Sequence, residues 1–440
     1  MIIFADMKRI VLLIALLCVS ASSASARCGL CSSENNTPGF VASSVIVRDF
    51  TLDLEYSASP WMSGWNFEKA LRVDRERRGG LDYFTVRFPD RECSFRSVVG
   101  DNGTFEGVPV DSRLMIGISP DLNSITVTNE LGQIFYFGDN PGEKEYGPYR
   151  ESDSQDIWAS SWLLRRIELP GSTRYLDFKW EKTADGKSHL KEIVTPFEKA
   201  VIRYKDGQPD YFKSIHEDQF TNKGTACFYT DGVLSSARVS AKGEYKLSYD
   251  STSGYLSRLD APDGCFKLFE YAEDKGKLKC AVRRFCKDGK EKEKVESTFG
   301  NGMRLESREK TEYQGEESTV TCETFYYRDG LLRSISSSSS DGHSKTCGFR
   351  YPAESIESAS PEQKVALNAM LGLNMEGLVV SRTVNEDGKT SVYRYDYGRY
   401  SDISLYLPSK LYVTPTGEKS ERLSKEFNWD KYGEPIPVKY

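Results

Sequence analysis

The chain has 440 residues, of which 38% are hydrophobic and 28% charged, and its formal net charge is −6. This composition is typical of a folded globular protein, and the 35 glycines and 17 prolines are too few to indicate a disordered chain. Lysine and arginine number 59 against 65 aspartates and glutamates, so the sequence lacks the basic excess of nucleic-acid-binding proteins. We therefore expect no nucleic-acid partner.

Residues 1–26 have the pattern of a secretory signal peptide. Lys8 and Arg9 precede the apolar stretch 10–19, and small residues then lead to an A-x-A sequence that ends at Ala26. The apolar stretch is about half as long as the roughly 20 residues that a membrane-spanning helix needs. We expect cleavage after Ala26 and a mature chain that is secreted, periplasmic or at the cell surface, without membrane insertion.

Ten cysteines occur in the sequence, and nine follow the expected cleavage site. An oxidising compartment favours disulfides, although this cysteine content is far below that of a disulfide scaffold. We expect a few local bridges together with buried thiols. Cys28 and Cys31 have redox spacing but lack the βαβ context of a redox site, and the sequence has only three histidines. No metal site is expected.

An internal repeat organises the second half of the sequence. Tyr249, Gly254 and Leu256 recur 22 residues later as equivalent residues of a second unit. The equivalent residues are Tyr271, Gly276 and Leu278. Weaker copies contain an aromatic residue, a polar turn with glycine and usually a leucine, and they begin at Phe178, Tyr204, Tyr229, Tyr327, Tyr395 and Trp429. The alternation of large and polar residues before each turn predicts a β-hairpin.

A single hairpin is marginally stable in water, so neighbouring units are expected to pair edge to edge and bury a shared face. The many tyrosines suit this arrangement, because a tyrosine can pack its ring and keep its hydroxyl in water. The predicted fold is therefore all-β, with antiparallel hairpin repeats forming a curved or spiralling sheet.

The pattern resembles the Rhs/YD-repeat family, whose units contain a Tyr-Asp pair, a glycine and a leucine, followed by a glycine turn. The residues of one unit that match are Gly243, Tyr249, Asp250, Gly254, Leu256 and Gly264. The other units match in part, and Ala272 stands where the Asp after Tyr271 would be. Gly64-Trp65 and the stretch 124–137 are similar to the lead-in segment and to a hairpin of Rhs-type proteins.

The resemblance covers roughly residues 45–440 and implies a β-sheet ribbon that spirals around a cavity. We accordingly expect a flexible segment at 27–44, an Rhs-like β region at 45–162 and degenerate YD-type repeats at 163–440. The repeats are too few to predict a closed shell over an open curved sheet, and both arrangements remain open.

One segment departs from the β pattern. Ser360 is a candidate N-cap, Pro361 a first helical residue and Gln363 its N3 residue, and Gly372 is a stop signal. We predict a short helix near 360–372 whose apolar residues, beginning at Val365, pack on the sheet or plug one end of it. A partner-binding helix is the alternative. The serines at 336–340 are expected to form a solvated hairpin tip.

Searches for catalytic motifs find little. His189, His216 and His343 lie in polar, turn-like settings, and the sequence has no H-E-x-x-H, G-x-S-x-G or phosphate-binding loop. A carboxylate pair for glycoside hydrolysis stays open, because such residues meet only in space. We expect no catalytic, cofactor-binding or metal-binding residues. The tryptophans expected to pack in the core are Trp61, Trp65, Trp158, Trp162 and Trp180.

These observations favour an exported, non-enzymatic Rhs/YD-like scaffold that binds a surface glycan or a protein partner through a concave aromatic face. One alternative is a component of a toxin or cargo-encapsulating shell. Another is a carbohydrate-active enzyme.

Overall fold

The computed structural model describes residues 39–47, 50–60, 62–69, 71–78, 81–88, 92–99, 105–109, 113–148, 157–169, 175–183, 187–216, 223–300, 304–315, 317–400 and 405–429. The predicted signal peptide, the Cys28/Cys31 pair and Trp61 lie outside these residues.

The described chain is built almost entirely of antiparallel strands. A small sheet and a helical turn come first: β1 Gly39–Val47, β2 Phe50–Ala58, β3 Ser63–Trp65 and α2 Asn66–Lys69. The large sheet begins with β4 Arg72–Arg78, β5 Leu81–Arg87, β6 Glu92–Val99, β7 Phe105–Pro109, β8 Met115–Ile118, β9 Ser124–Thr128 and β10 Ile134–Gly138. A 3-10 turn, η1 Pro141–Glu143, then leads to β11 Lys144–Pro148 and β12 Ile157–Glu168.

The large sheet continues through the repeat region, mostly by pairing each strand with the next. The strands are β13 Tyr175–Lys182, β14 Ser188–Val194, β15 Glu198–Lys205, β16 Gln208–His216, β17 Lys223–Thr230, β18 Val233–Val239, β19 Gly243–Tyr249 and β20 Leu256–Asp260. They are followed by β21 Phe266–Asp274, β22 Lys277–Phe285, β23 Glu291–Phe299, β24 Leu305–Gln314, β25 Glu317–Arg328, β26 Leu331–Ser339 and β27 Ser344–Arg350. The helices α3 Pro352–Ser355 and α4 Pro361–Gly372 precede β28 Ser381–Glu386, β29 Lys389–Tyr400, β30 Leu405–Thr414 and β31 Arg422–Glu426.

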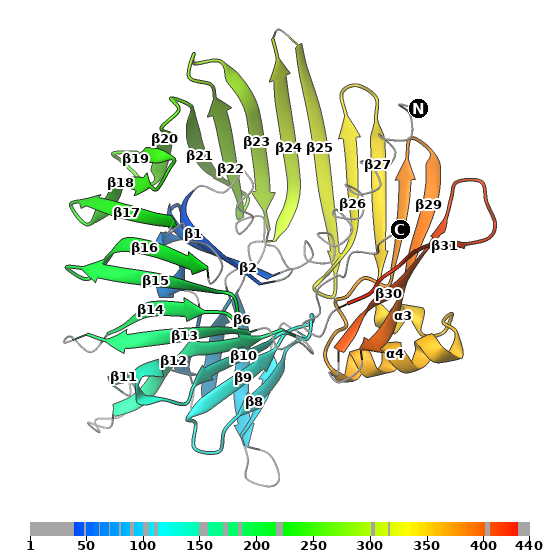
Figure 1. Cartoon of the computed structure of the whole chain (residues 1–440), viewed down its shortest axis with the longest axis horizontal. Helices are drawn as coiled ribbons and strands as arrows, with labels where there is room; N and C mark the ends of the chain where they lie inside the picture. The colour runs from blue at the N-terminus through cyan, green and yellow to red at the C-terminus, as the bar shows by residue number, and fades with distance from the viewer. Residues whose placement is uncertain are drawn as a thin grey trace.

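Figure 1 shows the large sheet curving from β8 through β17 and β24 to β31, with β1 and β2 inside the curve. Among the described residues the large sheet contains 28 strands, and β31 at its far edge pairs only with β30. The predicted all-β fold of antiparallel hairpins in a curved sheet is therefore confirmed, and the predicted hairpin within 124–137 is formed by β9 and β10.

Strand β12 joins the two parts of the large sheet, because it is long enough to have two partners along each edge. It pairs with β11 and β10 along one edge, and with β4 and β13 along the other. The strands from β4 to β10 therefore curl back onto β12, and their buried residues belong to one cluster that includes Phe84, Phe95, Ile125, Phe137 and Trp162. The expected boundary between residues 162 and 163 falls inside this strand.

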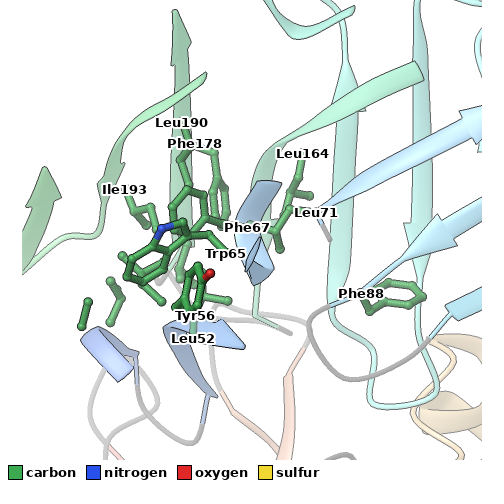
Figure 2. Packing of buried hydrophobic residues seen from close by; sticks show 14 of the residues in the cluster. Leu52, Tyr56, Trp65, Phe67, Leu71, Phe88, Leu164, Phe178, Leu190 and Ile193 are labelled. Atoms are coloured by element: carbon green, nitrogen blue, oxygen red, sulfur yellow. The ribbon is translucent and has the colours of Figure 1, made fainter. Parts of the chain in front are cut away.

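The small sheet and α2 pack against the inner face of the repeat strands, and we call β1, β2, β3 and α2 the plug. Trp65 of the plug donates a hydrogen bond from Nε1 to the Tyr229 hydroxyl over 2.8 Å, and its ring centroid lies 4.6 Å from that of Phe212. Thr225 donates from Oγ1 to the carbonyl oxygen of Ala42 over 2.7 Å. Figure 2 shows plug side chains gathered against those of the repeat strands, among them Tyr56, Trp65, Phe67, Phe178, Leu190 and Ile193.

The predicted helix is present as α4, inserted together with α3 between the paired strands β27 and β28. The Ser360 hydroxyl accepts a hydrogen bond from Gln363 N, as an N-cap should. The Gln363 amide does not complete a capping box, since it donates to Tyr397 O and accepts from Tyr397 N on β29. Val365 was expected on the packed side and is 69% exposed, whereas the buried residues are Ala366, Leu367 and Met370.

The connection from α4 to β28 returns to the beginning of the large sheet, and we call residues 374–377 the latch. Asn374 donates from Nδ2 to the carbonyl oxygens of Arg113 and Thr128, each over 3.0 Å. Gly377 N donates to Glu130 O over 2.8 Å, and a Cβ at position 377 would lie only 2.8 Å from Glu130 Cγ. The two regions of the sheet are thus brought together by loops, although in the described sheet β31 pairs with β30, and β4 pairs with β5 and β12.

The serine run at 336–340 is mostly strand, which corrects the prediction of a hairpin tip. Ser336 to Ser339 belong to β26 and pair with β25 and β27. The turn lies just beyond, where Gly342 has φ 94 and Gly342 N donates to Ser339 O.

Candidate functional site

The aromatic residue of most repeats lies at a β-bulge just before the hairpin turn. Register shifts occur immediately before Trp180, Tyr204, Tyr229, Tyr249, Tyr327 and Tyr397. A bulge adds one residue to a strand, bends it and increases its local twist. The bulges therefore contribute to the curvature of the sheet.

These aromatic side chains also link each hairpin to the one before it. The hydroxyl or indole group donates to a main-chain carbonyl oxygen of the preceding hairpin in the pairs Trp180–Leu164, Tyr204–Leu190, Tyr229–Pro209, Tyr249–Leu234, Tyr271–Leu256, Tyr351–Leu332 and Tyr397–Val379. Tyr271, for example, bonds to the Leu256 oxygen over 3.0 Å. Each link gives a polar aromatic side chain a main-chain acceptor.

The prediction that the tyrosine hydroxyls stay in water is wrong for these links. Burial raises the pKa of the hydroxyls of Tyr204, Tyr229, Tyr249 and Tyr271 far above the usual value. A buried hydroxyl needs a partner because an unpaired polar group is costly away from water, and the neighbouring carbonyl supplies it.

The other repeat-defining residues form turns and close contacts. Gly254 and Gly276 have φ values of 72 and 74, which residues other than glycine rarely adopt. Asp250 accepts hydrogen bonds at Oδ1 from Thr252 N and Ser253 N, and these bonds hold the pKa of its carboxyl below the usual value.

The remaining repeat-defining residues lie at positions of close packing. Gly243 and Gly264 also have positive φ, and a Cβ on Gly243 would lie 2.7 Å from Pro262 Cβ. Leu256 is fully buried and Leu278 half-buried.

The concave aromatic face, expected as the working surface, is largely covered by the plug from β13 to β20. Trp65 and Trp162 are buried, and Trp180 is half-buried with its indole bonded to Leu164 O. Trp158 lies in β12, and its side chain is outside the described residues. The aromatic rings of this region therefore hold the fold together instead of facing a partner.

The same face of the sheet changes character beyond β23. Val282 and Val295 face each other at the edge of the core, and the next residues in register across the strands are Lys310 and Thr321. One row of directly paired residues then crosses six strands after β23, and we call it the charged row: Ser297, Arg308, Glu323, Ser337, Lys345, Glu386 and Lys389.

The charged row alternates in charge, and its residues on β24 to β26 are half-buried. Arg308 pairs with Glu323 over 2.5 Å, and Lys345 with Glu386 over 3.2 Å. On β26 the row residue Ser337 is half-buried, whereas its neighbour Ser336 on the opposite face is exposed. The charged row is therefore on the inner, concave side of the sheet.

The plug contains a half-buried carboxyl group, that of Glu68 in α2, which the sequence did not indicate as a site. Desolvation raises the pKa of Glu68 from 4.5 to about 7, against the opposing charges of Lys69 and Lys187. The negative charge of Glu68 in turn contributes to the raised pKa values of Tyr204 and Tyr229. Its place three residues after Trp65 gave little signal, because the strands that cover it come from far along the chain.

Histidines and cysteines are dispersed over the described structure. The His189 ring lies 4.5 Å from that of Tyr204, and His343 Nδ1 lies 2.8 Å from Asp387 Oδ2 at an exposed turn. Within the described ranges, no group of three or more His, Cys, Asp or Glu side chains is placed to hold a metal ion. Burial raises the pKa of the Cys227 and Cys280 thiols to about 12, which confirms the expectation of buried thiols. The expected local bridges are not formed in the described structure by Cys227, Cys265, Cys280, Cys286 or Cys322, whose thiols are all free.

No helix in the described part of the chain is long and apolar enough to cross a membrane.

Comparisons with known proteins find no matching family model and no matching curated protein. Among solved structures, the chain aligns with "Crystal Structure of TcdB2-TccC3" over 81% of its own length and 27% of that chain, at 10% identity and a TM-score of 0.29. A porin-like protein from Bacteroides vulgatus ATCC 8482 aligns over 57% of this chain and 97% of the other, at 12% identity and a TM-score of 0.19. A porin-like protein from Bacteroides uniformis ATCC 8492 aligns over 81% and 94%, at 8% identity and a TM-score of 0.14. These scores are too low to carry an argument about fold or function.

Proposed function

We propose that this protein is an exported, non-enzymatic scaffold of the Rhs/YD-repeat type that binds a polar, charge-bearing polypeptide along the charged row. The observation that carries the proposal is the change of one continuous sheet face. This face is hydrophobic at Val282 on β22 and Val295 on β23. From β24 onward it carries the Arg, Glu and Lys side chains of the charged row.

Folding energetics alone do not account for this row. A partly exposed ion pair such as Arg308–Glu323 typically contributes about 0–1 kcal/mol to stability. Alternating charges across an interface, in contrast, fix the register of a partner and disfavour wrong partners. The row therefore suits recognition better than structural support.

Site-specific photo-crosslinking tests the proposal with a matched pair of positions. A photoreactive residue is placed at Ser337 on the inner face or at Ser336 on the outer face of β26. The proteins are expressed in the native host, irradiated, and their cross-linked products identified by mass spectrometry. We expect one polypeptide to be cross-linked from position 337 and not from 336, and Arg308→Glu to reduce its yield at least about tenfold.

Cross-linking from position 336 alone, or from neither position, would contradict the proposal. Retention of the protein by a glycan, unchanged in the Arg308→Glu variant, would instead indicate a carbohydrate ligand bound elsewhere.

Export is tested separately, by N-terminal sequencing of the protein recovered outside the cytoplasm. A sequence starting at Arg27 is expected from the signal-peptide pattern. A mature protein that keeps residues 1–26 would contradict export by this route.

A second candidate function is a layer of a cargo-enclosing shell, and the latch is the observation that favours it. The latch brings the α4 region against the β8–β10 region, so that the chain curves back on itself. Co-purification of a cytotoxic polypeptide protected from added protease would support this function. Equal proteolysis of that polypeptide with and without this chain would exclude it.

A further inference from the structure

Cys265 and Cys286 lie directly opposite each other on neighbouring strands. Cys265 immediately precedes β21, and Cys286 immediately follows β22. The two strands pair in unbroken register from Phe266 opposite Phe285 to Asp274 opposite Lys277. Extending this register by one residue places the two cysteines face to face.

The main-chain hydrogen bonds show which kind of pair they form. Ala261 N donates to Cys265 O over 2.8 Å, so the peptide groups of Cys265 face β20. Cys286 N donates to Lys290 O over 2.9 Å, so those of Cys286 face β23. The cysteines are therefore a non-hydrogen-bonded pair, for which the Cα atoms are about 4.5 Å apart and the side chains are close. That spacing is within the roughly 4.4–6.8 Å that a disulfide spans.

The strands stay close on both sides of this pair. The Phe266 and Phe285 rings are stacked, with centroids 4.6 Å apart. On the other side, a Cβ built on Gly264 would lie 3.1 Å from Lys287 Cβ. Contacts on both sides of the pair therefore keep the two chain segments close at the cysteines.

Three other described cysteines face residues of other types across the ladder. Cys227 pairs with Ala237, Cys280 with Tyr271 and Ser297, and Cys322 with Glu309 and Ser338. The opposed arrangement is thus not a general feature of cysteines in this sheet.

We infer that Cys265 and Cys286 form a redox-sensitive disulfide site. The two thiols lose two protons and two electrons to an oxidised low-molecular-weight disulfide such as oxidised glutathione, which is released as two reduced thiols. The new S–S bond joins the turn between β20 and β21 to the turn between β22 and β23. The inference is independent of partner binding, and an extracytoplasmic compartment would supply such an oxidant.

Peptide mapping of the full chain tests the inference. The purified protein is equilibrated with oxidised glutathione, its remaining thiols are alkylated in denaturant, and it is digested with trypsin without reduction. Trypsin separates the relevant cysteines into peptides 259–267, 280–283 and 285–287. We expect peptide 259–267 linked to 285–287, with the product lost on reduction, and peptide 280–283 alkylated.

Two variants complete the test. Cys286→Ser is expected to abolish the linked product, and Cys280→Ser to leave it unchanged. Recovery of both cysteines as alkylated peptides or only as separate glutathione adducts would overturn the inference. So would linkage of either cysteine to a third one.

Discussion

The plug-covered part of the sheet, from β13 to β20, and the part from β23 to β31 use the same hairpin but bury it differently. In the first part, the plug lies on the inner face, and one cluster joins its residues to those of the repeat strands. In the second part, Phe299 and Leu305 near its start still belong to this cluster. Most of the other buried residues form small clusters near the insertion, one of which contains Met370 and Tyr397 and another Tyr351. The aromatic link to a carbonyl of the preceding hairpin occurs in both parts. The aromatic link therefore forms with or without the plug above it. The polar inner face, in contrast, occurs only on strands that the plug does not cover.

The first prediction tests how much the plug stabilises the strands that it covers. Trp65→Ala removes the largest buried side chain of the plug. The Trp65 ring packs between Tyr56, Phe67 and Phe212, so its loss leaves a cavity and removes the donor to the Tyr229 hydroxyl. We expect the free energy of unfolding to fall by about 3–5 kcal/mol in urea denaturation.

Tyr326→Ala is the control for this loss, because Tyr326 is 56% exposed in the second part of the sheet. A loss below about 1 kcal/mol for Trp65→Ala would show that the plug is dispensable for the repeats.

The second prediction concerns how stability depends on pH through the half-buried Glu68. Its pKa is raised from 4.5 to about 7 in the folded state, so the protonated form is favoured by folding. The stability from this group is therefore fully present below about pH 4.5 and is lost as pH rises through 7. Between pH 5 and 8, wild type should lose about 2–3 kcal/mol more than Glu68→Gln.

Denaturation curves at the two pH values measure this difference. Glu312→Gln, which removes a carboxylate outside the plug, is the control for the substitution itself. Identical pH profiles for wild type and Glu68→Gln would refute the burial of an uncharged Glu68.

The third prediction concerns the latch, which connects the two compared regions. Asn374 has φ 56, so Asn374→Gly keeps the backbone conformation and removes only the two side-chain hydrogen bonds. We expect a loss of about 2 kcal/mol, roughly 1 for each bond, and a larger maximum dimension in small-angle X-ray scattering.

Glu376→Gln is the matched control for the latch. It weakens a partly exposed ion pair with Arg113 and should change stability by less than about 1 kcal/mol. An unchanged scattering profile for Asn374→Gly would mean that the curvature of the sheet alone sets the distance between the two regions.

The repeat hairpins and the helix α4 could be predicted because their signals are local. Tyr249, Gly254 and Leu256 lie within one unit, and Ser360 caps a helix that begins at the next residue. The plug could not be predicted, because it packs on the repeat strands through contacts between residues far apart in the sequence, such as Trp65 and Tyr229. The charged row was equally hidden, because it depends on the register of seven strands and each strand contributes one residue.

The last prediction asks whether the aromatic link contributes equally in both regions. Tyr249→Phe and Tyr397→Phe each remove one hydroxyl and leave a carbonyl, that of Leu234 or Val379, without its donor. Both carbonyls belong to buried residues, so each substitution should lower the free energy of unfolding by about 1 kcal/mol, measured by urea denaturation. The control Tyr326→Phe removes an exposed hydroxyl and should have no measurable effect. A loss at Tyr249 alone would show that the link needs the plug above it, and the two regions would then differ in more than their cover.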